Sequence, residues 1–273
     1  MFMVGVFSFG ENLLMLAVPL YMLQLYDRVL ISNSKATLIS LTVITVLALT
    51  VMCILSLSRS RMLVAASDWL ERRLSPGLFE RAVQNRLKPG NYGTEALNDL
   101  STIRGFATSP GMACFFDLPW TLVFLAFAYI LHPWFGHIAV IAALLLIIVA
   151  LLGEWKGRTP VNLANRAGMI ARQQLEATAR NAEVIEAMGM MEPVRKKWAD
   201  VNVRRLELQG IAQNQSAVFL SLSKFIRLTA QILTLGTGAW LVLNLEATGG
   251  AMIAASIILG RALGPIEQAI GSW

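Results

Sequence analysis

The stretch "LPWTLVFLAFAYILHPWFGHIAVIAALLLIIVALLG" (residues 118–153) contains no Asp, Glu, Lys or Arg, and it decides the class of fold. One helix over the whole stretch would be about 54 Å long, whereas about 20 apolar residues already cross a bilayer. Residues 132–136 ("HPWFG") place a proline and a glycine near its middle, which is typical of a turn. We therefore predict a hairpin of two membrane-spanning helices.

Similar uncharged runs cover residues 36–58 and 228–245, in a chain that is 56% hydrophobic and only 15% charged. The first apolar segment is long enough to span and lacks the basic leader and cleavage site of a signal peptide. The sequence thus predicts an all-α membrane protein with six transmembrane helices and long cytoplasmic helical extensions. The predicted spans are residues 4–26, 37–58, 113–131, 137–153, 226–245 and 250–270.

Basic residues are unevenly distributed between the links. Of the 23 Lys and Arg residues, 8 lie in residues 59–112 and 10 in residues 154–215, while the links 132–136 and 246–250 have none. Basic residues favour the cytoplasmic side of a membrane. We therefore place the hairpins 59–112 and 154–225, and both chain ends, in the cytoplasm. The net charge of +6 then reflects topology, and no nucleic-acid partner is expected.

Each cytoplasmic hairpin contains helix breakers near its middle, "KPGNYGTE" at 88–95 and "EAMGMMEP" at 186–193. Apolar residues recur at helical spacing on either side of both breaks. Each segment is predicted to leave the membrane as a helix, turn, and return as a helix. Such arms would extend on the order of 40 to 50 Å.

Five motifs carry a resemblance to a known family. They are "NLLMLAVPLYMLQLYDRVL" (12–30), "FFDLPW" (115–120), "LHPWFG" (131–136), "RNAEVIEAMGM" (180–190) and "GAMIAASIILGRALGPIEQAIGSW" (250–273). Together they resemble the membrane domain of type I secretion ABC exporters, in the branch that exports proteases, lipases and adhesins. The resemblance implies a homodimer in the bacterial inner membrane. It also implies a periplasmic membrane-fusion adaptor, an outer-membrane channel protein and a secreted protein substrate with an uncleaved C-terminal signal.

Members of that family continue into a nucleotide-binding domain that holds ATP and Mg. No Gly-Lys pair occurs in this chain, so the phosphate-binding pattern G-x-x-x-x-G-K-[ST] is missing. We expect no catalytic residue, cofactor or metal in the chain itself, and ATP with Mg on a nucleotide-binding domain outside it. Family members also usually carry a polar segment before the first span, so the chain is expected to be trimmed at both ends.

The resemblance places coupling helices at about residues 89–98 and 181–192, where the membrane domain would contact the nucleotide-binding domain. Val184, Ile185 and Met188 offer an apolar face for this docking. The alternative is an ordinary helix turn packed on its neighbours. The predicted coupling residues are Asn91, Tyr92, Gly93, Glu183, Glu186 and Gly189.

Arg261 lies inside the last apolar run, where a charge costs about 2.5 to 3.5 kcal/mol on insertion scales and is a functional hypothesis by default. Gln268, seven residues on, shares its helix face. That face is predicted to line a translocation path for a hydrated polypeptide. The alternative is a structural ion pair between helices.

Three further charged residues are candidates for the translocation path. Glu11 lies about 22 Å and Arg261 about 17 Å from the predicted outer membrane edge, so pairing between them is possible, although Glu11 is equally suited to the inner interface. Lys224 and Arg227 near the fifth span either line the cargo entrance or extend toward lipid headgroups.

Prolines in three spans predict helix kinks, at Pro19, Pro119 and Pro265. Two readings remain open for "FFDLPW". Asp117 caps a helix start with Pro119 just inside it, or the helix runs through and Pro119 bends it. Pro19 raises the same question.

The leading hypothesis is therefore the transmembrane half of an ATP-driven protein exporter. One alternative is an ABC exporter of lipids or drugs. Only the motif resemblance argues against it. A second is a non-transporting membrane scaffold, which needs no charges at depth such as Arg261 and Glu11. A stand-alone enzyme is not expected, because no cluster of a nucleophile with a base, or of metal ligands, is evident.

Overall fold

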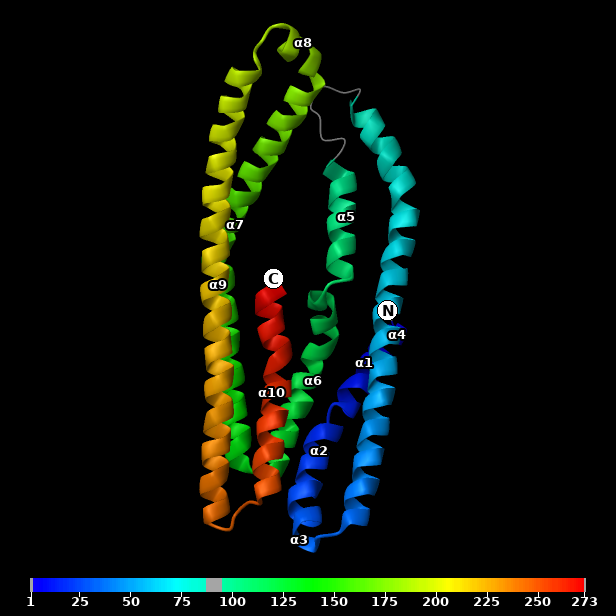
Figure 1. The fold of residues 1–273 in the computed structure, drawn as a ribbon, viewed down its shortest axis with the longest axis vertical. Coiled ribbons are helices and arrows are strands. Elements are labelled where there is room, and N and C mark those ends of the chain that lie inside the picture. Colours follow the sequence, from blue (N-terminus) through cyan, green and yellow to red (C-terminus); the bar gives the residue numbers. More distant parts are fainter. Residues whose placement is uncertain (1, 87–94, 273) are drawn as a thin grey trace. The chain divides into compact units, whose positions relative to one another are not determined.

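The computed structural model describes residues 2–86 and 95–272, which form helices joined by short turns and contain no β-strand (Figure 1). They divide into two compact units, residues 1–144 with 226–273 and residues 145–225. The helices are α1 (Phe2–Leu14), α2 (Ala17–Gln24), the π-helical segment η1 (Leu25–Val29), α3 (Leu30–Ser32), α4 (Lys35–Arg86), α5 (Glu95–Ala107), α6 (Pro110–Leu131), α7 (Pro133–Arg180), α8 (Ala182–Ala187), α9 (Met191–Leu243) and α10 (Gly249–Ser272).

Six segments of these ranges are long and apolar enough to cross a membrane, which confirms the predicted all-α class. They are Met3–Ser32, Lys35–Glu80, Cys114–Leu131, Pro133–Arg180, Met191–Leu243 and Gly249–Gly271. The decisive hairpin is also confirmed, because His132 alone separates α6 from α7, with an extended backbone at φ −167° and ψ 141°. Pro133 opens α7, at a position where its missing N–H costs nothing.

The first span is interrupted in its middle. α1 ends at Leu14 and α2 begins at Ala17. Pro19 is fully buried in α2 and has no N–H to donate to the carbonyl of Met15, so the helical ladder fails there. By contrast, α6 continues through Pro119 and α10 through Pro265. The reading of Asp117 as a helix cap is therefore wrong, because α6 already begins at Pro110.

α10 is the most buried of the candidate spans in the described chain and packs against α6 and α2. Its buried side chains include Ala254, Ala255 and Ala262, and small residues of this kind let membrane helices approach closely. The thiol of Cys114 on α6 donates a hydrogen bond to the carbonyl of Pro265 at 2.8 Å. Half of the predicted membrane segment of α10 is thus covered within one copy of the chain.

The first span meets the start of α10 through Asp27, which lies in η1. Its Oδ2 accepts a hydrogen bond from the Thr248 hydroxyl at 2.6 Å, and its Oδ1 accepts one from the Gly250 N–H at 3.1 Å. Asp27 thereby satisfies a free amide at the helix start from another part of the chain. A Cβ on Gly250 would lie 2.6 Å from Asp27 Oδ1 and 2.7 Å from the carbonyl oxygen of Leu23.

Gly250→Ala is therefore expected to destabilise the chain, because the backbone carbonyl of Leu23 cannot move aside cheaply. We expect a loss of about 1 to 3 kcal/mol, the usual cost of overpacking, measured by thermal unfolding in detergent. Gly249→Ala is the matched control, since a Cβ there meets nothing within 4 Å. Equal unfolding temperatures for the two variants would contradict this packing.

The second unit confirms the predicted hairpin around residues 186–193. The helical ladder breaks at Asn181, the short helix α8 follows, and Gly189 adopts φ +65° before α9 begins at Met191. Figure 1 shows α7 and α9 as the two long sides of this hairpin, with α8 at its turn. A Cβ on Gly153 of α7 would lie 3.2 Å from the Phe219 ring of α9, so the two sides pack closely within this unit.

The first hairpin differs from the prediction in one respect. Its predicted turn at 88–95, with Asn91, Tyr92 and Gly93, falls almost entirely outside the described residues. The returning helix is not continuous with the third span, because α5 ends at Ala107 and α6 begins at Pro110. Proline disfavours the helical conformation in the residue before it, and Ser109 is accordingly extended, at φ −79° and ψ 158°.

Candidate functional site

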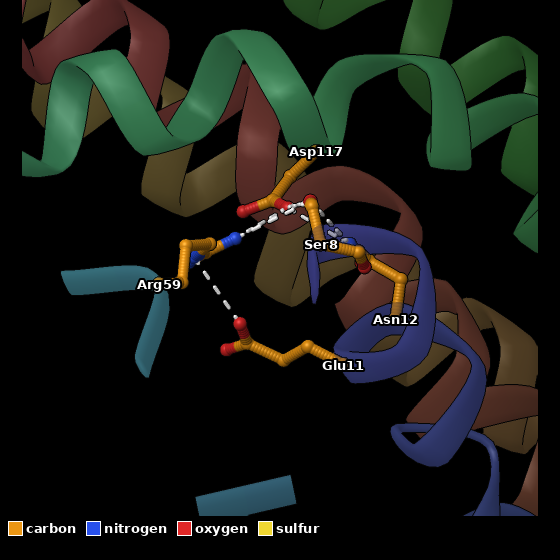
Figure 2. Close-up of polar contacts among 5 residues, drawn as sticks. All are labelled: Ser8, Glu11, Asn12, Arg59 and Asp117. Carbon is orange, nitrogen blue, oxygen red and sulfur yellow. Dashed lines mark hydrogen bonds and ion pairs between the residues drawn. The ribbon is translucent and has the colours of Figure 1, made fainter. Parts of the chain in front are cut away.

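A polar cluster joins α1, α4 and α6 around Arg59 (Figure 2). Arg59 Nε lies 3.2 Å from Glu11 Oε2, and Arg59 Nη1 lies 3.0 Å from Asp117 Oδ1. The side chains of Arg59, Glu11 and Asp117 are 12%, 8% and 16% exposed. Two carboxylates from different helices therefore share one largely buried guanidinium. We call Arg59, Glu11, Asp117, Ser8 and Asn12 the Arg59 cluster.

Neutral donors complete the cluster. The Ser8 hydroxyl and the Asn12 amide each donate to Asp117 Oδ1 at 2.8 Å, and both residues are buried. Asn12 also donates to the Ser8 carbonyl at 2.9 Å, which orients its amide. Buried charges are tolerated only when they are paired and hydrogen-bonded. These donors therefore stabilise the second carboxylate, which one arginine cannot fully balance.

The local sequence explains how α1 supplies three of these groups. Ser8, Glu11 and Asn12 occupy positions i, i+3 and i+4, which place them on one helix face. Glu11 and Asp117 are both candidates from the sequence, whereas Arg59 is predicted only as the first residue of the cytoplasmic hairpin 59–112. The available signal was the polar i, i+3, i+4 spacing in an otherwise apolar span, since polar groups there face the protein interior.

The structure pairs Glu11 with Arg59, so the possible pair with Arg261 is not what forms. Glu11 is 6% exposed and does not lie on an open surface of the chain. Its predicted place on the translocation path is therefore not supported by its position in one copy. The equal alternative, that Glu11 lies toward the inner membrane interface, stays a prediction.

A second ion pair joins α9 and α10. The Arg227 guanidinium donates to Glu267, with side chains that are 27% and 14% exposed. Lys224, one turn before Arg227, is exposed. Of the two predicted entrance residues, Arg227 thus forms an ion pair within the chain, and Lys224 is exposed.

Arg261 lies on the uncovered face of α10. It is exposed, as is Gln268, whereas Ala262 and Leu263 beside it are fully buried. Within the described ranges, no carboxylate lies within ion-pair distance of Arg261. We call the face that carries Arg261 and Gln268 the open face of α10. It presents a cation and an amide outward from an otherwise closely packed helix.

The tip of the second hairpin presents the predicted coupling residues to solvent. Glu183, Glu186 and Gly189 are exposed, and the apolar side chains of Val184 and Met188 are 56% and 66% exposed. The reading of α8 as a turn packed on its neighbours therefore does not hold for these two side chains in one copy. The equivalent residues of the first hairpin lie outside the described residues.

No group of three or more metal-ligating side chains occurs among the residues with assigned positions. Cys53 and Cys114 are free thiols. The sites just described offer ion pairs, an open polar helix face and an exposed hairpin tip. They belong to a helical protein with six candidate membrane spans among its described residues.

Comparison with known proteins identifies the family to which the chain belongs. The family model described as "ABC transporter transmembrane region" matches residues 1–264, and the chain belongs to that family. The chain is also 35% identical over 272 residues, 99% of its length, to the "Type I secretion system ATP-binding protein PrsD" of Rhizobium meliloti (strain 1021). It spans 47% of that protein, about half its length. The predicted ABC membrane fold is thereby confirmed.

Proposed function

We propose that this chain is the transmembrane part of an ATP-driven type I protein secretion exporter, and that the open face of α10 lines the path of the unfolded substrate. The observation that carries the proposal is that Arg261 and Gln268 are both exposed on the most buried candidate span of the described residues. A secreted chain needs polar partners for its backbone inside the membrane. The similarity to PrsD over 99% of the chain supports the protein-secreting branch.

The same proposal names the partners. A second copy of the chain completes the channel across the open face of α10, and a nucleotide-binding domain with ATP and Mg docks on the exposed hairpin tip that carries Val184 and Met188. A periplasmic membrane-fusion adaptor and an outer-membrane channel protein continue the path. The complex resides in the bacterial inner membrane with both ends of the chain in the cytoplasm.

Secretion is tested with the full-length exporter, its adaptor and its outer-membrane channel expressed together. A protein with a C-terminal secretion signal should appear in the medium, and blocking ATP hydrolysis should abolish its export. The matched control is the same protein without its signal. Efflux of lipids or drugs without secretion of the signal-bearing protein would contradict the proposal.

The proposed topology predicts which side of the membrane each turn faces. Single cysteines at Trp134 and Glu246, both exposed, should react with an impermeant thiol reagent added from the periplasmic side. A cysteine at Glu186 should react only after the cells are opened. The background replaces Cys53 and Cys114 by serine. The opposite labelling pattern would reverse the orientation.

A further inference from the structure

Arg59 holds two helix segments that are each separated from their neighbours by a break. Glu11 lies on α1, just before the interruption at Met15 and Leu16. Asp117 lies on α6, shortly after the interruption at Thr108 and Ser109. Because both helices are interrupted nearby, neither segment continues as a regular helix past its break.

The helix that supplies Arg59 has no such break. α4 runs from Lys35 to Arg86 as one helix of 52 residues, and Arg59 lies near its middle. Beyond the cluster, Arg104 of α5 pairs with Asp68 and Glu71 of α4 at 2.8 and 2.6 Å. The returning helix is thereby attached to α4, while its own covalent route to the third span passes through the break at Ser109.

We propose that Arg59 is the positioning residue that transmits movement of the cytoplasmic part of α4 to the first and third spans inside the membrane. α4 is the continuous connection, and Arg59 is the point where it holds α1 through Glu11 and α6 through Asp117. A movement of the hairpin would otherwise be lost at the break between α5 and α6. The inference rests on the proposed function, because it assumes that a motor moves the hairpin.

The low solvent exposure of Arg59, Glu11 and Asp117 strengthens the ion pairs between α4 and the two other helices. The three charged side chains are at most 16% exposed, so solvent screens their attraction little. Arg59 engages its two partners through different nitrogen atoms, Nε and Nη1, so the planar guanidinium fixes the direction of both. Lysine, which is a single point charge, cannot reproduce this arrangement.

The test compares Arg59 variants in the full-length exporter in lipid vesicles. The main variant is the triple substitution Glu11→Gln, Arg59→Gln and Asp117→Asn, which removes all three charges together. Replacing a complete buried ion cluster is far milder than removing one member. We expect this variant to fold and hydrolyse ATP, but to export about tenfold less substrate per ATP, a change within the usual range of coupling energies.

The matched control is Arg61→Gln, which removes an exposed basic residue of the same helix and should leave export per ATP unchanged. A purely structural role for the cluster predicts normal export per ATP in the triple variant, and that result would overturn the inference. Absence of export in the unmodified exporter would instead count against the proposed function.

A second measurement keeps all five residues of the Arg59 cluster and needs no substrate. Spin labels at Ser60 on α4 and Phe115 on α6, both exposed, report the distance between the two helices in dimers with one labelled protomer. With the cluster intact, we expect the same distance with and without ATP. A change of one helix turn, about 5.4 Å, would show that α6 does not follow α4 and would overturn the inference.

Discussion

Replacing Arg59 alone by leucine is expected to destabilise the chain by roughly 3 to 5 kcal/mol, the usual result of removing one partner from a buried ion pair. The substitution leaves Glu11 and Asp117 without a cation in surroundings where their side chains are only 8% and 16% exposed. Ser8 and Asn12 can stabilise one of the two carboxylates, since both donate to Asp117, but not the other. Thermal unfolding in detergent and the yield of monodisperse protein measure the loss.

Two comparisons make this result specific to the cluster. Arg61→Leu removes an exposed arginine from the same helix and should change stability by less than about 0.5 kcal/mol, as surface substitutions usually do. Adding Glu11→Gln and Asp117→Asn to the Arg59→Leu variant should recover most of the lost stability. If Arg59→Leu unfolds at the same temperature as the unmodified chain, the ion pairs do not hold these helices together.

Arg261→Ala is expected to leave folding and dimerisation intact and to reduce secretion at least about tenfold, or about 1.4 kcal/mol. The side chain is exposed on the open face of α10 and forms no ion pair within the described ranges, so its removal breaks no salt bridge there. The effect falls on the substrate path, where a charge at this depth requires water or a partner. Secretion rate and unfolding temperature are measured on the same preparation.

Arg261→Lys should retain most of the secretion, because a cationic hydrogen-bond donor remains on the open face. The matched control is Ile44→Ala on α4, an exposed apolar position in the span with the least burial. A lower unfolding temperature for Arg261→Ala than for this control would show that the arginine has a structural partner, for example in the second copy. The path assignment would then be wrong.

The sequence was sufficient to predict the spans, because their signal is local. The uncharged run at 118–153 and the turn around Pro133 locate two helices without any knowledge of tertiary contacts. The break at Gly189 was predicted for the same reason. In contrast, the break between α5 and α6 was not predicted. Its sequence signal is the single dipeptide Ser109-Pro110, next to the longer apolar run of the third span.

The candidate site was only partly predictable, because its partners are distant in sequence. Arg59 and Asp117 are 58 positions apart, and neither spacing nor composition connects them. Depth alone suggested Glu11 and Arg261 as partners, but residues at similar depth need not face each other around a bundle. Arg59, and not Arg261, reaches Glu11 because α4 packs on α1. The shared face of Arg261 and Gln268 follows from helix periodicity, and both are exposed as that reasoning requires.

The central claim, that the open face of α10 lines the substrate path, is tested most directly by crosslinking. A photoreactive residue replaces Gln268 in the full-length exporter, with Arg261 retained, and export of a signal-bearing protein is stalled by a folded domain at its N-terminus. We predict an adduct between position 268 and the stalled substrate that requires ATP, and none from the same photoreactive residue at Ile44. No adduct at 268, or equal adducts at both positions, would contradict the claim.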